Sequence, residues 1–405
     1  MIKYLLLLIP VIFLACQGSS EKSKLPEIQS GSIQPMPDQW IDADTKHRIF
    51  RIGRDSAENR SFYFHNNPFI PGKGDDGDLM VYYSKVDGNN QLFVVNLKTL
   101  KSEQLTNHNH RIRGEIVNPK LREAFYQSRD SVFAVNVDTK ENRLVYVFPE
   151  DFKAGISAVN STGELMAGSW SAPIKDSIYR ADPRKSSYFE SIYEAKIPHT
   201  VFTVNINTGI LNKIHSDTAW INHIQFSPID PKLLMFAHEG PWHKVDRIWT
   251  VDVTNPNPKL MHQREVYREI AGHEFFSKDG KTIWYDLQKP REVNFFLAGV
   301  NIETGKKTMY ELQSDQWSIH FNISPDQQSF AGDGGDSTQV AHAKNGRWIY
   351  HHVPKDDTLI SEKLVNMSTH NYRPLEPNVH FSPDGKWVIF RSDMDGKSEI
   401  YGVEL

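Results

Sequence analysis

Cysteine is nearly missing from this sequence, because Cys16 is the only one among 405 residues. The chain that follows Cys16 contains no cysteine and cannot rely on disulfide bonds. A hydrophobic core must therefore hold the fold, and a composition with 39% hydrophobic and 11% aromatic residues is an ordinary globular supply for one.

An excess of positive charge is also missing. The formal net charge is -4, and no block of Lys or Arg points to nucleic acid or to a membrane surface. The sequence has no Gly-x-Ser-x-Gly elbow, which argues against a hydrolase or a peptidase. Helical periodicity is nearly absent and strand-like runs dominate. These absences predict a globular all-β protein that does not bind nucleic acid.

The N-terminus resembles a bacterial lipoprotein signal. Lys3 lies in a short basic start, an apolar run follows from Leu5 to Leu14, and Cys16 comes directly after it. The run is too short for a membrane-spanning helix. We expect residues 1–16 to be a signal peptide, Cys16 to be lipidated, and residues 17–37, rich in Ser, Gly, Lys and Pro, to be a flexible tether. The expected location is the cell envelope, with the membrane contacted only through the lipid anchor. A plain secretory signal is the alternative.

Turn signals recur along the rest of the chain at intervals of roughly 40–70 residues, which is the range of propeller blades. Each turn precedes a β-rich run, and several third strands end in a Val-Asn-x-x-Thr turn. These turns are Val95–Thr99, Val135–Thr139, Val204–Thr208 and Val300–Thr304. The pattern predicts a seven-bladed β-propeller over residues 38–405.

The two ends of the repeat predict how the ring closes. The last repeat stops at its third strand, Ile400–Leu405, and a spare strand is available at His47–Ile52. Pairing the two would complete the last blade and remove an exposed sheet edge. An insert from about Ala172 to His199 lengthens the third blade, and we expect it to overhang one face as a loop or short helix.

Four polar residues occupy the same phase of four innermost strands, each four residues before a serine. They are His223, His273, His320 and Asn378. A ring of blades would gather such positions at the upper end of its channel. Metal binding and proton transfer both need a cluster of this kind.

Further polar residues are expected on the same upper face as substrate contacts, together with His223. They are Arg60, His65, Arg113, His238 and Arg373. Arginine grips carboxylates bidentately, and a neutral histidine accepts a proton near physiological pH. This combination suits β-elimination on a uronic acid, in which a cation neutralises the carboxylate while a base removes the proton from C5. It predicts an acidic oligosaccharide as substrate, with Tyr63 as a candidate proton donor.

Four stretches resemble the oligogalacturonate lyases of polysaccharide lyase family 22. They are Phe236–Trp249, Gly272–Gly280, His320 with Gly332–Asp336, and Phe381–Gly385 with Phe390–Asp393. The resemblance implies a seven-bladed propeller and a polysaccharide lyase in which His273 is the catalytic base and Arg247 the essential arginine. On the residues alone, Arg247 could instead pair with Asp246 or Glu239 and pin its loop.

The resemblance also implies a manganese ion held by three histidines and a glutamine, of which His320 matches one. In place of the others this chain has Arg373, Glu376 and Asn378. The oxygen atoms of Glu376 and Asn378 would suit Mn²⁺ or Ca²⁺ beside His320. Either the metal site has changed, or Arg373 neutralises the substrate carboxylate instead. Both alternatives allow a uronate linkage other than oligogalacturonate.

Two functions therefore remain open. The first is a lipid-anchored lyase that cleaves a uronate-containing oligosaccharide. The second is a non-catalytic, TolB-like envelope propeller that binds a glycan or a protein on the same face. The histidine cluster and the motifs around Arg247 and His273 favour the enzyme, whereas the lost metal ligands favour the binding protein.

Overall fold

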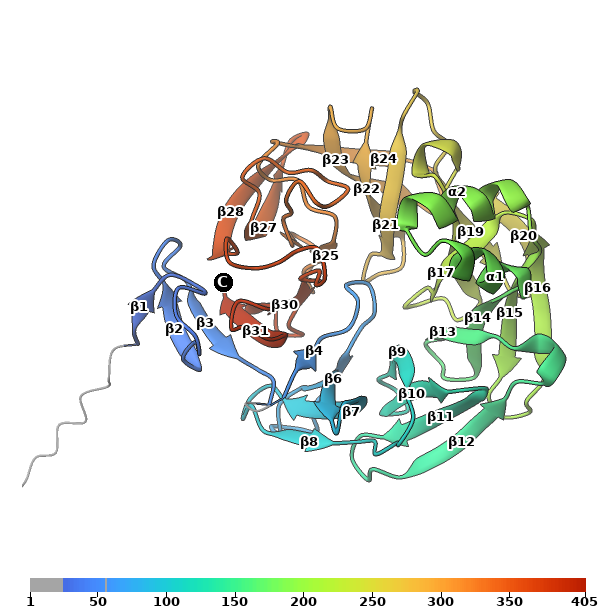
Figure 1. Ribbon diagram of the computed structural model, residues 1–405, viewed down its shortest axis with the longest axis horizontal. Coiled ribbons are helices and arrows are strands. Elements are labelled where there is room, and N and C mark those ends of the chain that lie inside the picture. The colour runs from blue at the N-terminus through green and yellow to red at the C-terminus, as the bar shows by residue number, and fades with distance from the viewer. Residues whose placement is uncertain (1–24, 55–56) are drawn as a thin grey trace, which may run out of the picture.

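The computed structural model describes residues 25–54 and 57–405, and its strands form seven antiparallel blades around a central channel (Figure 1). The predicted all-β, seven-bladed propeller is confirmed. The expected signal peptide, Cys16 and the start of the expected tether lie outside the described residues. Among the described helices, none has the length and apolar character needed to cross a membrane.

The first four blades follow the chain from the inside of the ring outwards. Blade 1 contains β4 (Asn59–Arg60), β5 (Phe69–Ile70), β6 (Leu79–Val86), β7 (Asn89–Asn96) and β8 (Ser102–Gln104). Blade 2 contains β9 (Arg113–Asn118), β10 (Glu123–Ser128), β11 (Ser131–Asn136) and β12 (Asn142–Val147), and the short helix η1 (Glu150–Phe152) follows it. Blade 3 contains β13 (Gly155–Val159), β14 (Leu165–Ser171), β15 (His199–Asn205) and β16 (Leu211–Asp217). Blade 4 contains β17 (Trp220–Phe226), β18 (Leu233–Glu239), β19 (Ile248–Asp252) and β20 (Asn255–Leu260), with the short helix η2 (Trp242–Lys244) after β18.

The last three blades complete the circle. Blade 5 contains β21 (Ile270–Phe276), β22 (Thr282–Gln288), β23 (Phe295–Asn301) and β24 (Lys307–Leu312). Blade 6 contains β25 (Phe321–Ile323), β26 (Phe330–Gly332), β27 (Trp348–Lys355) and β28 (Thr358–Asn366), and one parallel bridge joins β28 to β24. Blade 7 contains β29 (His380–Phe381), β30 (Trp387–Ser392), β31 (Glu399–Glu404) and the N-terminal strand β3 (Arg48–Arg51).

Closure takes place as the sequence predicts, through β3. It pairs antiparallel with β31, with Ile49 opposite Val403, and both side chains are fully buried. The predicted boundary at residue 37 is wrong, because the chain is already packed before it. Strand β1 (Glu27–Ile28) pairs with β2 (Gln39–Asp42), Met36 is buried, and the Ser30 hydroxyl donates to Asp42. The ordered propeller therefore includes residues expected in the tether.

The repeated turns obey one local rule. After the third strand of a blade, an asparagine side chain accepts hydrogen bonds from the backbone N–H groups that follow it, which closes an Asx turn. Asn96 accepts from Lys98 and Thr99 at 3.0 Å, and Asn136, Asn205 and Asn301 repeat this contact. The same short-range chemistry is thus reproduced in four blades.

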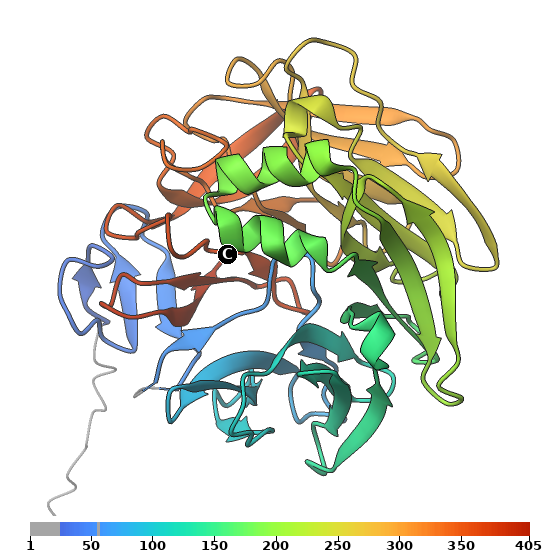
Figure 2. The same cartoon turned by 45° about the vertical axis from the view of Figure 1, so that its right-hand side comes forward.

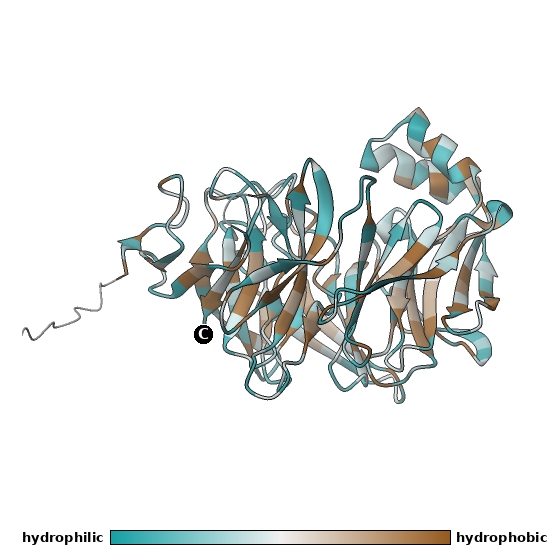
Figure 3. Ribbon diagram, turned by 90° about the horizontal axis from the view of Figure 1, so that it is seen from below, coloured by the Kyte–Doolittle hydropathy of each residue, from teal (hydrophilic) through white to brown (hydrophobic). Residues whose placement is uncertain are grey.

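The insert of blade 3 forms two helices, α1 (Ile174–Ala181) and α2 (Lys185–Ala195), between β14 and β15. They stand above one face of the ring (Figures 2 and 3), which we call the upper face. The expectation of a short helical overhang is confirmed. Ile192 and Ile197 pack there against Trp220 of β17, which attaches the insert to blade 4.

Apolar side chains fill the seams between neighbouring blades. Val81 of β6 packs in one cluster with Tyr126 of β10, and Val201 of β15 packs in another with Leu234 of β18. Blade 1 departs from this regular plan, because its innermost strand is interrupted. Residues 61–68 leave the sheet between β4 and β5 and run into the channel, where Figure 1 shows them near the centre.

Candidate active site at the upper end of the channel

The four aligned positions do meet in the channel, and three of them do so through an unusual backbone. His223, His273 and Asn378 have φ values of 49°, 47° and 52°, in the left-handed region. The pairing register shifts at His223 and at His273, as in a β-bulge. A bulge turns its side chain out of the sheet, and residues in this region cost roughly 1–3 kcal/mol of strain. The strain recurs at equivalent positions that all face the channel.

The segment between β4 and β5 plugs the channel beneath these residues, and we call residues 61–67 the plug. The Phe64 N–H donates to Asn378 Oδ1 at 2.9 Å, and the Phe64 carbonyl accepts from Asn322. The ring of Tyr63 lies 5.1 Å from that of His320. Sequence reasoning assigned this segment to the upper face but missed the break in the strand, because two-residue strands carry no periodicity.

His65 lies lower than predicted. It lines a cavity of about 640 Å³ on the underside of the plug, together with Lys278 and the Ser-Pro turns of the lower face. Burial and the neighbouring histidines lower the pKa of His65 well below its usual value. The predicted contact between His65 and substrate on the upper face is therefore wrong: the plug carries this side chain away from that face.

His273 has the geometry of an oriented base. Its Nδ1 donates to Asp286 Oδ1 over 2.7 Å, which fixes the ring and leaves Nε2 as the acceptor. Its side chain remains 16% exposed. The sequence does not indicate Asp286, because this residue lies on the neighbouring strand β22.

His320 is oriented in the same way but is fully buried. Its Nδ1 lies 2.5 Å from Asp333 Oδ2, and its Nε2 lies 3.3 Å from the Tyr63 hydroxyl and 3.8 Å from Glu376 Oε2. Burial lowers the pKa of His320, but the Asp333 carboxylate outweighs it and raises the pKa above its usual value. The rings of His273 and His320 are 4.9 Å apart, so the predicted cluster is formed.

The predicted metal ligands differ in whether their ligand atoms are available to bind a cation. His320 Nε2 and the half-exposed Glu376 carboxylate point at each other, and Asp333 supports His320 as outer-shell carboxylates support metal-bound histidines. Asn378 does not fit, because its Oδ1 accepts from the plug and its Nδ2 donates to the Glu376 carbonyl. The prediction of Asn378 as a ligand is corrected: it holds the plug. His320 and Glu376 fit a cation that keeps positions open to water or substrate.

Arg247 forms a buried ionic triad with two carboxylates. Its Nε donates to Glu274 at 2.8 Å and its Nη1 to Glu239 at 2.6 Å, and all three side chains are at most 5% exposed. Burial raises the pKa of Glu239, but Arg247 and His223 outweigh it and hold the pKa well below its usual range. His223 Nε2 lies 3.2 Å from Glu239. The pairing with Glu239 is therefore real, whereas Asp246 pairs with Arg264 instead.

Arg391 is a buried arginine that the sequence does not indicate as a site residue, although it lies in the stretch Phe390–Asp393. It is 2% exposed, and it donates to the backbone carbonyls of Glu376 and Ser61. Within residues 25–54 and 57–405 it forms no ion pair, and burial lowers its pKa to about 10. The predicted contacts Arg60 and Arg373 are exposed instead. Arg391, not Arg373, therefore lies against the Glu376 backbone.

A basic hollow lies on the upper face of blades 2 and 3. It encloses about 590 Å³ and is lined by the predicted Arg113 together with Arg129, Lys153 and Lys175. Lys175 belongs to α1 and lies 4.8 Å from the ring of Trp220. Lys185 of α2 lies over Trp242. Burial raises the pKa of Glu376, but the charges of His320, His273, Arg391 and, least of all, Lys185 outweigh it and lower that pKa. The insert thus brings positive charge over the channel mouth.

His238 is not in the channel, and its predicted contact with substrate there is not supported. It is the penultimate residue of β18 at the seam between blades 3 and 4, where its ring packs on Trp249 at 4.9 Å. Its Nε2 faces Asp217 of β16. Neighbouring residues on a strand point to opposite sides, so Glu239 reaches the channel and His238 does not.

We expect Arg247→Met to lower the free energy of unfolding by about 3–5 kcal/mol, since it leaves two buried carboxylates without a counter-charge. Arg264→Met is the matched control, because it breaks a half-exposed pair and should cost about 1 kcal/mol or less. Urea denaturation followed by tryptophan fluorescence measures both. Equal losses in the two variants would contradict the buried triad.

Acid should destabilise the fold before the carboxylates titrate. Burial lowers the pKa of His380 to about 3, and an unfolded histidine takes up its proton near pH 6.5. Between these values the unfolded state binds more protons than the folded state. The free energy of unfolding therefore falls by about 1.4 kcal/mol for each pH unit of acidification and each such histidine. Urea midpoints at about pH 7.5, 6 and 5 measure the slope. A His380→Gln variant should show a smaller slope, and an unchanged slope would argue against a neutral His380.

Comparison with known proteins extends over the whole propeller. Residues 36–405 match the family model described as oligogalacturonate lyase. The chain is 24% identical to the oligogalacturonide lyase of Pectobacterium atrosepticum and to the oligogalacturonate lyase of Dickeya dadantii, each over 382 residues that cover 89% of this chain and 94% of the relative.

Solved structures show the same fold. The oligogalacturonate lyase of Vibrio parahaemolyticus superposes with a TM-score of 0.77 at 24% identity, covering 90% of this chain and 96% of that one. An oligogalacturonate lyase in complex with manganese superposes with a TM-score of 0.76 at 22% identity, covering 94% and 98%. The similarity therefore includes the blades that carry His273, Arg247 and His320.

Proposed function

Because the chain belongs to the oligogalacturonate lyase family, we propose that it cleaves a uronate-containing oligosaccharide by β-elimination at the upper end of its channel. As a member of this family it is a carbon–oxygen lyase. The observation that carries the assignment of the site is the His273–Asp286 pair, an oriented and partly exposed base. It lies among buried cations and beneath a basic overhang, where an acidic sugar would be attracted.

In the first step of the proposed reaction, His273 Nε2 removes the proton from C5 of the uronate. Asp286 keeps the proton of the neutral ring on Nδ1 and stabilises the imidazolium that forms. The electron pair left on C5 is delocalised into the carboxylate, and expulsion of the oxygen on C4 completes the elimination. Tyr63 is a candidate to protonate that oxygen, since burial raises its pKa well above the usual value and keeps its hydroxyl protonated.

Charge at the carboxylate of the substrate is the second requirement. Arg247 is oriented by Glu239 and Glu274, but these two carboxylates outnumber its single charge. Further positive charge is available from Arg391 below and from Lys175 and Lys185 above. Arg247 is thus proposed as a positioning contact, with the neighbouring cations lowering the free energy of the enolate-like transition state.

His320 and Glu376 would hold a divalent cation of the Mn²⁺ or Ca²⁺ class, with Asp333 fixing the His320 ring. Such an ion, when bound, supplies charge neutralisation at the uronate carboxylate. A related lyase structure contains manganese, which supports the same class of ion here. Arg373 remains the alternative neutralising group, on a loop beside the site.

The basic hollow is proposed to bind the next sugar carboxylates of the chain. Four basic side chains line this cavity, Arg113, Arg129, Lys153 and Lys175, together with two acidic ones, Asp130 and Asp176. Arginine and lysine recognise carboxylates, whereas a neutral glycan would gain little from this lining. An acidic oligosaccharide longer than two residues therefore fits better than a neutral one.

We expect His273→Ala to lower the rate of formation of unsaturated uronate by about 10²–10⁴-fold, the usual contribution of a general base. Asp286→Asn should reduce kcat more than KM, because it disturbs the orientation of the base and not binding. His342→Ala, on an exposed loop of blade 6, is the control and should keep full activity. The absorbance of the unsaturated product, followed with a panel of uronate oligosaccharides, measures the activity of each variant.

Chelator separates the two ways of neutralising the carboxylate. Loss of activity on chelation, restored by Mn²⁺ or Ca²⁺, would support the cation at His320 and Glu376. Activity that survives chelation but is lost in Arg373→Ala would support the arginine. Wild-type protein that is inactive on every uronate tested would overturn the lyase and favour the non-catalytic glycan- or protein-binding propeller.

We also propose that the protein is anchored in the cell envelope through a lipid on Cys16, on the basis of the N-terminal sequence alone. In a bacterial host, the full-length chain should fractionate with membranes and incorporate labelled fatty acid. Cys16→Ser should do neither, while its propeller still folds and elutes as a soluble protein. Label retained in Cys16→Ser would contradict this site of attachment.

A further inference from the structure

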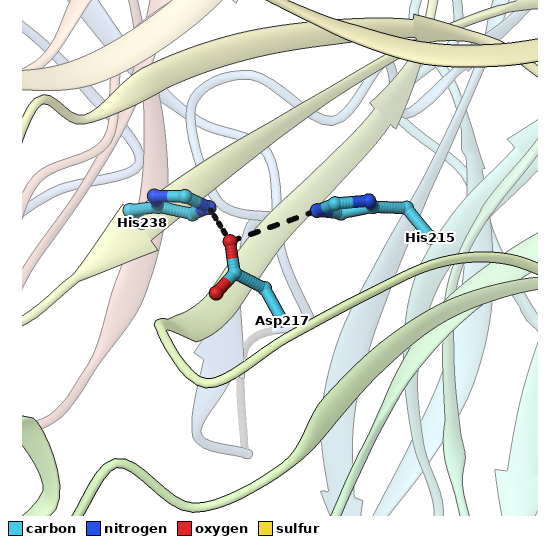
Figure 4. A group of neighbouring side chains, drawn as sticks. All are labelled: His215, Asp217 and His238. Atoms are coloured by element: carbon cyan, nitrogen blue, oxygen red, sulfur yellow. Dashed lines mark ion pairs between the residues drawn. The ribbon is translucent and has the colours of Figure 1, made fainter.

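Away from the channel, three side chains with metal-ligating atoms meet at the seam between blades 3 and 4. His215 and Asp217 lie on β16, the outer strand of blade 3, and His238 is the penultimate residue of β18 in blade 4. Nε2 of each histidine lies 3.7 Å from Asp217 Oδ2, and all three ligand atoms lie within 4.8 Å of one another (Figure 4). The lyase reaction proposed above uses none of these three.

The separations are longer than hydrogen bonds, so Asp217 does not satisfy either histidine. His238 Nε2 is buried and has no hydrogen-bond partner among the described residues. A buried nitrogen left without a hydrogen-bond partner lowers stability, and most buried polar atoms in native structures have one.

The surroundings hold the three groups in place. Asp217 Oδ1 accepts from the backbone N–H groups of Thr218 at 2.6 Å and Ala219 at 3.1 Å, which turns Oδ2 toward both histidines. The rings of His215 and His238 both pack on Phe236, at 5.6 Å and 5.7 Å. Outer contacts of this kind orient first-shell ligands in metal sites.

We propose that His215, Asp217 and His238 bind a divalent transition-metal ion of the zinc class. Two imidazoles and one carboxylate suit Zn²⁺ or Co²⁺ better than Ca²⁺ or Mg²⁺, which prefer oxygen ligands. Tetrahedral Zn²⁺ places its ligand atoms roughly 3.3–3.5 Å apart. Each 3.7 Å separation between a histidine and Asp217 needs to shorten by only a few tenths of an ångström. The two imidazole nitrogens lie within 4.8 Å of each other and need to move closer together as well. Water would complete the coordination, because the three residues are only partly buried.

A cavity of about 220 Å³, lined by His238, Asp246 and Trp249, gives the ion a path to the site. The ion would fasten the outer strand of blade 3 to the second strand of blade 4. His238 precedes Glu239, which holds Arg247 in the channel. The site would therefore stabilise the strand end that orients the buried ionic triad.

Cobalt titration of chelator-treated, full-length protein tests this directly. We expect a visible absorption band of tetrahedral or five-coordinate Co²⁺ that Zn²⁺ abolishes, and a higher melting temperature with Zn²⁺. Asp217→Asn and His215→Gln should each weaken Zn²⁺ binding at least tenfold, measured by competition with a chromophoric chelator. His320→Ala is the matched control, since it removes the ligand in the channel and should leave the band unchanged.

Circular dichroism shows whether each variant is folded, and His215→Gln provides a second reading if Asp217→Asn is not. A band that persists in both folded seam variants, or one lost only in His320→Ala, would overturn the proposal. The readout does not depend on lyase activity, so failure of the proposed lyase function leaves this result unaffected.

Discussion

The pairing of β3 with β31 closes a ring of seven blades, and the channel exists only because that ring is closed. The side chains of the site come from several blades: His223 from blade 4, His273 from blade 5, His320 from blade 6, Asn378 from the start of blade 7 and the plug from blade 1. An open ring would not hold these residues close together. The fully buried Ile49 and Val403 fasten the closing strand, so a contact on the outside of the ring maintains the geometry at its centre.

Within the closed ring, the backbone conformation directs side chains into the channel, and buried carboxylates then orient them. Left-handed φ at His223, His273 and Asn378 turns side chains into the channel, and the sheets on either side keep those conformations in place. Carboxylates then orient the rings and the guanidinium: Asp286 for His273, Asp333 for His320, Glu239 and Glu274 for Arg247. The site therefore holds oriented groups before any substrate arrives, which reduces reorganisation in the transition state.

The insert of blade 3 adds positive charge above a channel that contains many carboxylates. The channel contains Glu239, Glu274, Asp286, Asp333 and Glu376, so its own walls are rich in negative charge. Lys175 and Lys185 on α1 and α2 place positive charge above it, next to Trp220 and Trp242. An anionic sugar would approach through this basic rim, and changes in the insert alone would change selectivity without altering the base.

The sequence by itself determined the all-β class, the number of blades, the closing strand and the shared phase of His223, His273 and His320, because turn residues and strand alternation are local properties that repeat. Only the tertiary structure decided which groups touch. Asp286 and Asp333 are paired with their histidines across neighbouring strands, and Arg391 and the plug reach the site from the last and first blades. Three predicted roles differ from the structure for this reason. His65 lies on the lower side because its strand is broken, and His238 points away from the channel because side chains alternate along a strand. Asn378 binds the backbone N–H of the plug instead of a metal. Such contacts join residues that are distant in the chain, and no local pattern encodes them.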